Sequence, residues 1–262
     1  MPYICSTCNS IIQNFQLSCP NCGQWNSLRK HFGVTSRNDS QPVPLPRIQS
    51  FVIPRIRTKI EQLDSLLGNG LVPGSSVLLA GPPGAGKSTL VLQILKTMNV
   101  SSLYVTGEES VQQLKLRADR LKIHSAKILL LFETNVNTIL AHIHQTKIQL
   151  LVIDSIQMMY SDSSNTLPGS TTQIRKSTYI LRRLAQQRNL ILIIVGQVTK
   201  TKAAAGPKLL EHAVDVVLQL DALDDQAHHR ILSASKNRFG STAPRCMLFM
   251  RKTGLVFQGM KQ

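Results

Sequence analysis

A glycine-rich loop between an apolar strand and a helix restricts the possible folds of this chain more than any other feature. Residues 77–80 (VLLA) are expected to form a buried strand, and residues 87–98 show the spacing of a helix. Between them runs Gly81-Pro82-Pro83-Gly84-Ala85-Gly86-Lys87-Ser88-Thr89, which matches the pattern Gly-x4-Gly-Lys-Ser. A strand, such a loop and a helix in this order form a phosphate cradle. We therefore expect an α/β fold that binds ATP through residues 81–89.

The residues of this loop have distinct expected roles around a bound nucleotide. The backbone amides of residues 84–88, at the positive end of the helix, would surround the β-phosphate. Lys87 would bridge the β- and γ-phosphates, the Ser88 hydroxyl would ligate Mg²⁺, and Thr89 would lie near the α-phosphate. ATP is thus the expected substrate and Mg²⁺ an expected cofactor.

Apolar strands alternate with helical patterns along the middle of the chain. Buried strands are expected at residues 103–105, 128–131, 150–153 and 190–195, and helices at residues 111–122 and around Val136, Ile139, Leu140 and Ile143. This alternation predicts a mostly parallel sheet flanked by helices, with right-handed crossovers. Closely spaced strands after residue 213 predict an antiparallel edge.

Hydrolysis of ATP requires a carboxylate that holds Mg²⁺ and a group that activates the attacking water. Asp154 ends the strand at residues 150–153, which is the expected place for the first carboxylate. Glu108 and Glu109 follow the strand at residues 103–105 and would lie at the same edge of the sheet. Two adjacent carboxylates point in different directions, so we expect one to be catalytic, with Glu108 favoured, and the other to be structural.

Gln197 ends the long apolar strand at residues 190–196 and could sense the γ-phosphate. The loop behind it is small and basic, and its lysines are Lys200, Lys202 and Lys208. Such a loop suits contact with a nucleic-acid backbone. The alternative is an ordinary surface loop.

Four cysteines near the N-terminus have the spacing Cys5-x2-Cys8-x10-Cys19-x2-Cys22. Two Cys-x2-Cys pairs supply the four thiolates of a tetrahedral, structural Zn²⁺ site. We therefore expect a zinc ribbon at residues 1–28, an extended linker at residues 29–55 and an ATPase domain at residues 56–262. The fifth cysteine, Cys246, lies in an apolar run and is expected to be buried.

The net charge of +16 is unevenly distributed. Residues 61–164 carry 8 basic and 8 acidic side chains, whereas residues 165–262 carry 15 and 5, net +10, and residues 1–60 carry 7 and 1, net +6. Clustered Lys and Arg indicate a polyanion such as DNA or RNA, with a solvated basic surface as the alternative. No apolar run is long enough to span a membrane and the cysteines begin near the first residue, so a cytoplasmic protein without a signal peptide is expected.

Several further segments resemble the bacterial RadA (Sms) family of RecA-like ATPases. These segments are Cys19-Pro20-Asn21-Cys22-Gly23-Gln24-Trp25-Asn26, Leu71-Val72-Pro73-Gly74-Ser75, Gly107-Glu108-Glu109-Ser110, Asp154-Ser155-Ile156-Gln157, Gly206-Pro207-Lys208-Leu209-Leu210-Glu211-His212 and Lys236-Asn237-Arg238-Phe239-Gly240. The resemblance implies a RecA-like P-loop core preceded by a zinc ribbon. It also implies a DNA-dependent ATPase motor of recombination and repair that binds single-stranded and branched DNA, with helicase-like movement and RecA recombinase as a partner. Such proteins assemble into a ring of about six subunits.

The resemblance assigns Lys236 and Arg238 to the ATP site and to DNA binding. Two residues apart on a strand, their side chains would point to one face of the sheet. From there they could reach the γ-phosphate of a neighbouring subunit as fingers acting in trans.

This chain departs from the family pattern in three places. It stops at Gln262, where members usually continue into a Lon-protease-like domain that shapes the ring and contacts DNA. The loop has Pro82 where an acidic residue is more common and the small Ala85 where a bulkier residue is more common, and Gln197 replaces a common histidine. No catalytic group is lost, so ATP turnover is expected. The alternatives are a nucleotide-gated DNA- or protein-binding adaptor without motor activity, and a KaiC-like signalling ATPase, which would not explain the zinc ribbon.

Overall fold

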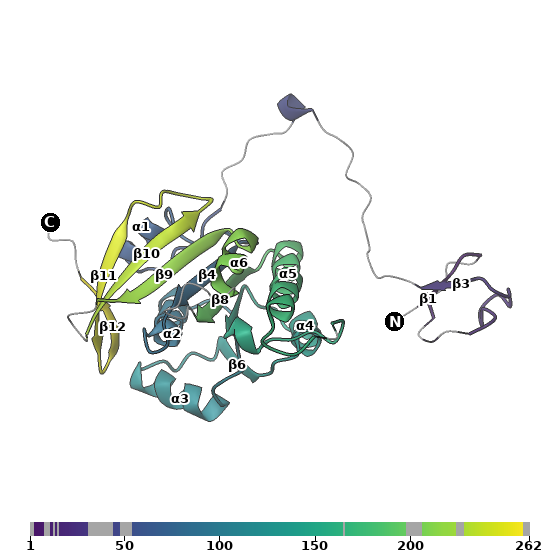
Figure 1. Cartoon of the computed structure of the whole chain (residues 1–262), viewed down its shortest axis with the longest axis horizontal. Coiled ribbons are helices and arrows are strands. Elements are labelled where there is room, and N and C mark those ends of the chain that lie inside the picture. Colours follow the sequence, from purple (N-terminus) through teal and green to yellow (C-terminus); the bar gives the residue numbers. More distant parts are fainter. Residues whose placement is uncertain are drawn as a thin grey trace. The chain divides into compact units, whose positions relative to one another are not determined.

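The computed structural model describes residues 3–7, 11–12, 14, 16–30, 44–47, 54–164, 166–197, 206–223 and 228–258. Internal contacts divide the chain into two compact units, residues 1–52 and residues 53–262. Figure 1 shows the elements of both units in sequence colours.

The first unit contains a three-stranded sheet among its described residues, in the order β2-β1-β3. The central strand β1 (Tyr3–Cys5) pairs antiparallel with β2 (Ile11–Ile12) and with β3 (Leu28–Lys30). Among the described residues of this unit, the buried apolar core consists of Cys5, Cys19 and Leu28. So small a core favours a cross-link, such as a bound metal ion, as the main source of stability. A single-turn 3-10 helix, η1 (Leu45–Arg47), lies further along this unit.

The described residues of the second unit form a nine-stranded sheet in the order β12-β11-β10-β9-β4-β8-β7-β5-β6. The strands are β4 (Ser76–Gly81), β5 (Ser102–Thr106), β6 (Ile128–Phe132), β7 (Leu150–Asp154), β8 (Ile191–Gln197), β9 (Val216–Ala222), β10 (His229–Asn237), β11 (Arg245–Arg251) and β12 (Gly254–Phe257). Strands β9, β4, β8, β7, β5 and β6 run parallel. Strands β9 to β12 pair antiparallel with one another, which confirms the antiparallel edge expected after residue 213.

Helices cover both faces of this sheet, because side chains of buried strands alternate between two apolar cores. Leu79 belongs to the core that is shared with helices α1 (Glu61–Leu66), α2 (Lys87–Met98) and α3 (Val111–Arg120). Its neighbour Leu78 belongs to the core that is shared with α4 (Val136–Gln145), α5 (Thr171–Arg188) and α6 (Gly206–Ala213). Figure 1 shows α4, α5 and α6 grouped together, with β10, β11 and β12 at the yellow end of the sheet. A further 3-10 turn, η2 (Ile156–Met158), follows β7.

One expected buried strand is in fact the edge of the sheet. Residues 128–131 read as a buried strand because they are all apolar, but β6 pairs only with β5 among the described residues. Leu129 is therefore 44% exposed and Phe132 56% exposed. Within the part of the chain that the structure describes, no helix is long and apolar enough to cross a membrane.

Candidate nucleotide site and a cation cluster

The phosphate loop connects the end of β4 at Gly81 to the start of α2 at Lys87. The loop requires glycine at its first position, because a Cβ atom at Gly81 would lie 2.3 Å from the carbonyl oxygen of Leu220. Gly86, which precedes α2, has a φ of 102°, a conformation that favours glycine. Glycine at these two positions lets the loop pass close to its neighbours and lead into α2, whose N-terminal amides can bind a phosphate.

Lys87 is folded back onto its own loop. Its Nζ atom donates hydrogen bonds to the carbonyl oxygens of Gly81 and Pro82, both at 2.8 Å. Burial lowers the pKa of Lys87, and the negative charges of Asp154 and Glu108 oppose that shift. The ammonium group is therefore desolvated and surrounded by acceptors, an environment in which the negative charge of a phosphate would be a favourable replacement for the two carbonyl partners.

Tyr104 joins the two groups that were expected to hold Mg²⁺. Its hydroxyl donates a short hydrogen bond to Oδ2 of Asp154 and also shares a hydrogen bond with Ser88. Complete burial, followed by the charge of Asp154, raises the pKa of Tyr104 well above its usual value. The hydroxyl therefore remains a donor throughout the physiological pH range, and it brings Ser88 and Asp154 to one point. These oxygen donors suit Mg²⁺.

The two adjacent glutamates are held by different partners. Glu108 accepts hydrogen bonds from the Ser155 hydroxyl at 2.5 Å and from Nε2 of Gln197 at 3.1 and 3.2 Å. Glu109 instead accepts a hydrogen bond from the Arg117 guanidinium at 2.7 Å. Glu109 is thus committed to an ion pair, whereas neutral donors hold Glu108. This difference favours Glu108 as the group that activates water.

These side chains surround one cavity of about 370 Å³ at the carboxyl edge of the sheet. Its lining includes the phosphate loop, Glu108, Glu109, Asp154 and Gln197, together with Arg117, Arg120, Ser155, Val195 and Met250. A cleft at the carboxyl ends of parallel strands is the usual ligand site of an open α/β sheet. The volume suits a small-molecule ligand such as a nucleotide.

Several contacts at this site were not predicted from the sequence. The sequence predicts Tyr104 only as a strand residue, although a hydroxyl in a fully buried strand requires a partner. Arg230, on β10, is buried, and its Nε atom donates to the carbonyl oxygen of Ala85 at 3.2 Å, so it supports the phosphate loop from behind. For Arg117 and Ser155, the sequence offers only their proximity to motif residues and does not predict their contacts with Glu109 and Glu108.

Gln197 links the cavity to a neighbouring turn. Its backbone carbonyl accepts a hydrogen bond from Nε2 of Gln157 at 3.3 Å, while its side chain binds Glu108. The lysines expected behind it, Lys200 and Lys202, lie outside the described residues, and so does the side chain of Lys208.

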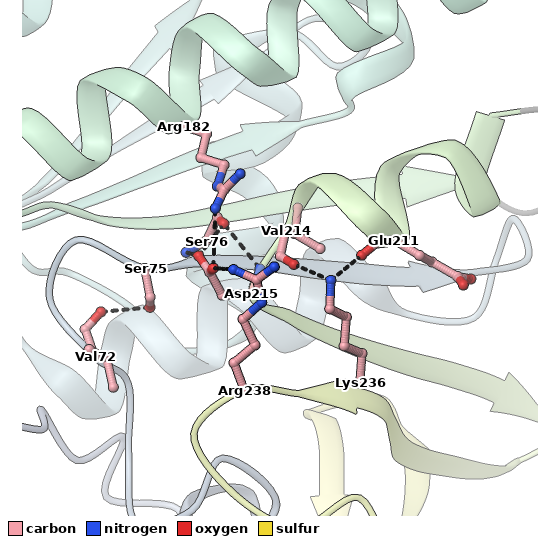
Figure 2. A network of polar contacts seen from close by, with 9 residues as sticks. All are labelled: Val72, Ser75, Ser76, Arg182, Glu211, Val214, Asp215, Lys236 and Arg238. Carbon is pink, nitrogen blue, oxygen red and sulfur yellow. Dashed lines mark hydrogen bonds and ion pairs between the residues drawn. The ribbon is translucent and has the colours of Figure 1, made fainter.

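Lys236 and Arg238 lie far from the phosphate loop of their own chain. Arg238 binds Asp215, whose backbone amide donates to the carbonyl oxygen of Ser76 at 3.0 Å. Ser76 begins β4 and Gly81 ends it, so the point where Asp215 is attached and the start of the loop lie about 17 Å apart along the strand. Figure 2 shows the cluster that these residues form with Arg182.

The strand that was expected to carry both cations ends between them. A β-bulge lies between Ala234 and Lys236, and β10 ends at Asn237, so Arg238 is outside the strand. The bulge precedes both cations, and Figure 2 shows their side chains extending from this segment in the same general direction. Lys236 binds the carbonyl oxygens of Glu211 and Val214, whereas Arg238 binds Asp215.

The cysteines of the first unit fit a zinc site. The sulfur atoms of Cys5, Cys19 and Cys22 lie within 4.8 Å of one another, and those of Cys5 and Cys22 are 3.7 Å apart. Four thiolates around one Zn²⁺ would lie about 3.8 Å apart, given a tetrahedron with Zn–S bonds of about 2.3 Å. The fourth expected ligand, Cys8, lies outside the described residues.

Sequence comparison identifies relatives over nearly the whole chain. The sequence profile of the AAA domain family matches residues 41–203. Proteins named DNA repair protein RadA from Listeria monocytogenes, Bacillus subtilis and Haemophilus influenzae are 40%, 39% and 38% identical to this chain, each over 97% of its length. The chain spans 58% of the length of each of these relatives.

Structure comparison agrees on the fold. The RadB recombinase superposes with a TM-score of 0.60 and 22% identity, covering 76% of this chain and 98% of its own. A KaiC-like protein from Pyrococcus horikoshii superposes with a TM-score of 0.67 and 20% identity, covering 79% of this chain and 100% of its own. The RecA-like sheet, the phosphate loop and the sequence relatives agree: the chain belongs to the AAA domain family and is a homologue of the RadA proteins.

Proposed function

We propose that this chain is a Mg²⁺-dependent ATPase motor that acts on single-stranded and branched DNA in recombination and repair. The observation that supports this most strongly is the convergence of Lys87, Ser88, Asp154 and Glu108 on one cavity. The relatives that match 97% of the chain are named for DNA repair, and the overall charge of +16 suits a polyanionic partner.

In the proposed reaction, Lys87 exchanges its two backbone carbonyl partners for the β- and γ-phosphates of ATP. Ser88 and Asp154, aligned by Tyr104, would hold the metal ion. Bound Mg²⁺ would neutralise charge on the β- and γ-phosphates. Glu108 orients the attacking water and accepts its proton.

Gln197 donates a hydrogen bond to Glu108, the carboxylate that would also hold the attacking water. The Gln197 side chain would therefore respond to the loss of the γ-phosphate. It immediately precedes the basic segment of the sequence, so its displacement would carry the nucleotide state to the proposed DNA contacts. Those contacts are Lys200, Lys202, Lys208, Lys236 and Arg238.

The proposed assembly is a cytoplasmic ring of about six subunits, in which each subunit meets the next head to tail. Arg238 lies at the end of β4 opposite its own phosphate loop, so it would serve the nucleotide of a neighbouring subunit, together with Lys236. Cys5, Cys8, Cys19 and Cys22 would hold a structural Zn²⁺, and RecA recombinase is the proposed protein partner.

The test is steady-state ATP hydrolysis with and without single-stranded DNA, using matched glutamine variants. Glu108→Gln should still bind ATP but lose about 100-fold or more in turnover, as expected for removal of a general base. Glu109→Gln, which affects the carboxylate paired with Arg117, should remain within about threefold of the wild type. Lys87→Ala should abolish turnover and weaken nucleotide binding.

Three results would count against the proposal in different ways. Near-normal turnover of Lys87→Ala would exclude this cavity as the ATPase site. Equal losses in the two glutamine variants would contradict the role given to Glu108. Tight ATP binding by the wild type without DNA-stimulated turnover would favour the nucleotide-gated adaptor instead of the motor.

A further inference from the structure

A buried carboxylate gathers two arginines at the end of β4 that lies opposite the phosphate loop. Asp215, which is 6% exposed, connects α6 to β9. Its Oδ2 atom accepts hydrogen bonds from the backbone amide and the hydroxyl of Ser76, at 3.0 and 2.7 Å. Its Oδ1 atom accepts from Arg238 at 3.2 Å and from Arg182 at 3.4 Å. One oxygen thus fixes Asp215 to the sheet, and the other holds the two guanidinium groups.

The two arginines approach Asp215 from different elements. Figure 2 shows Arg182 reaching it from α5 and Arg238 reaching it from the opposite side, after β10. The side chain of Arg182 is 26% exposed, whereas that of Arg238 is 53% exposed. Only one terminal nitrogen of Arg238 contacts Asp215, and a guanidinium carries five donors. Asp215 therefore holds Arg238 through one terminal nitrogen, and about half of the Arg238 side chain is exposed.

The backbone strengthens this attachment. The Arg238 amide donates to the Asp215 carbonyl oxygen at 3.1 Å, so the two residues are joined by main chain as well as by side chain. Lys236 is held differently, because its Nζ atom donates to the carbonyl oxygens of Glu211 and Val214, both at 2.8 Å. A change at Asp215 therefore releases the side chain of Arg238 without removing the hydrogen bonds of Lys236.

We propose that Asp215 is a positioning residue that orients Arg238 toward the nucleotide of a neighbouring subunit. This inference rests on the proposed function, in which Arg238 acts across a subunit boundary. A free arginine side chain samples many rotamers and loses that freedom when it meets a phosphate. The ion pair with Asp215, which is fixed on β4, restricts the rotamers of Arg238 before the phosphate arrives. The guanidinium donors of Arg238 that do not contact Asp215 stay available to the phosphate.

The test uses Asp215→Asn, which preserves the shape of the side chain and its ability to accept from Ser76 but removes the charge. DNA-stimulated turnover should fall about fivefold to tenfold, the size of coupling seen between directly paired residues. ATP binding by the subunit should stay within about twofold, because the cavity lies at the other end of β4. The matched control is Asp119→Asn, which breaks the exposed pair with Lys115 and should change turnover by less than twofold.

A double-mutant cycle separates positioning from a merely structural role. If Asp215 acts through Arg238, then Asp215→Asn combined with Arg238→Ala should turn over ATP at the rate of Arg238→Ala alone. Losses that multiply would show that Asp215 acts independently and would overturn the inference. A wild-type rate in Asp215→Asn would also overturn it. A wild-type rate in Arg238→Ala would instead refute the proposed function from which the inference starts.

Thermal unfolding of each variant shows whether the folded state is retained. Should Asp215→Asn fail to fold, Ser76→Ala withdraws the hydroxyl donor at 2.7 Å and keeps the backbone donor at 3.0 Å. Its expected loss of turnover is about twofold to threefold, a weakened form of the same coupling. This loss should likewise vanish in the Arg238→Ala background. If Ser76→Ala still lowered turnover in the Arg238→Ala background, that result would contradict the positioning role of Asp215, as multiplying losses in the first cycle would.

Discussion

The Tyr104 hydroxyl is the most testable contact at the nucleotide site, because Tyr104→Phe removes one oxygen and leaves the ring packing in place. Tyr104 is fully buried, and its hydroxyl donates to the charged Asp154. A hydrogen bond to a charged group contributes about 1.5–3 kcal/mol net. Asp154 lines the open cavity, so water can replace part of the lost interaction and the lower end of this range applies.

We therefore expect the free energy of unfolding to fall by about 1.5 kcal/mol in Tyr104→Phe. For a domain of this size, that loss corresponds to a melting temperature lower by about 3–6 °C. Because Tyr104→Phe has no hydroxyl to orient Asp154 for the metal ion, turnover should fall by about tenfold, equivalent to about 1.4 kcal/mol of transition-state stabilisation. Calorimetry without nucleotide and ATP hydrolysis over a Mg²⁺ titration measure the two effects. Tyr179→Phe, at a position 64% exposed, is the matched control.

The raised pKa of Tyr104 adds a pH signature to the same variant. The unfolded state releases the hydroxyl proton near pH 10, whereas the folded state retains it to higher pH. The stability contributed by this group is therefore complete below about pH 10 and is lost as the pH rises further. The stability difference between wild type and Tyr104→Phe should shrink above pH 10. Identical melting and turnover of the two proteins would refute the idea that Tyr104 orients Asp154.

Three further expectations concern other parts of the chain. Burial raises the pKa of Cys246 from 9.0 to about 11, so the thiolate fraction of Cys246 at pH 8 should be about 100-fold lower than that of a free cysteine. Mass spectrometry should therefore find Cys246 unlabelled by iodoacetamide until the protein unfolds. Chelation of zinc, or removal of residues 1–28, should leave the melting transition and ATP binding of the second unit intact, because that unit has its own core. Loss of the second unit's cooperative melting would show that the boundary between the two units lies elsewhere. The affinity for single-stranded DNA should fall with salt: if about four to six phosphates are contacted, the logarithm of the binding constant should decrease with the logarithm of the salt concentration at a slope of roughly −3 to −4. Fluorescence anisotropy measures this slope, and a value near zero would contradict contact with the DNA backbone.

Local sequence determines the phosphate loop and its flanking elements, which is why these were predicted closely. The helix expected at residues 87–98 has the bounds of α2, and Asp154 ends β7 as expected. Apolar runs identify strands well but do not reveal their neighbours. Residues 128–131 therefore read as a buried strand, although β6 has only one partner among the described strands.

Contacts between residues far apart in the sequence account for what could not be predicted at the site. Tyr104 and Asp154 are 50 positions apart, and Arg230 and Ala85 are 145 positions apart, so neither pair forms a recognisable motif. The bulge before Lys236 depends on the pairing of β10 with β9 and has no reliable sequence signal. Motif residues could thus be named, but the residues that orient them required the fold.

The two ends of β4 explain how one chain could contribute to two nucleotide sites. Gly81 leads into the phosphate loop at one end, and Ser76 fixes Asp215, and through it Arg238, at the other. A strand cannot shorten, so the cation cluster cannot approach the phosphate loop of its own chain. Contact between the cluster of one subunit and the cavity of the next uses two different surfaces, which is a heterologous interface, and repetition of that contact generates a ring where the rotation closes. Each nucleotide would then be completed by the neighbouring chain, which makes assembly itself a condition for hydrolysis.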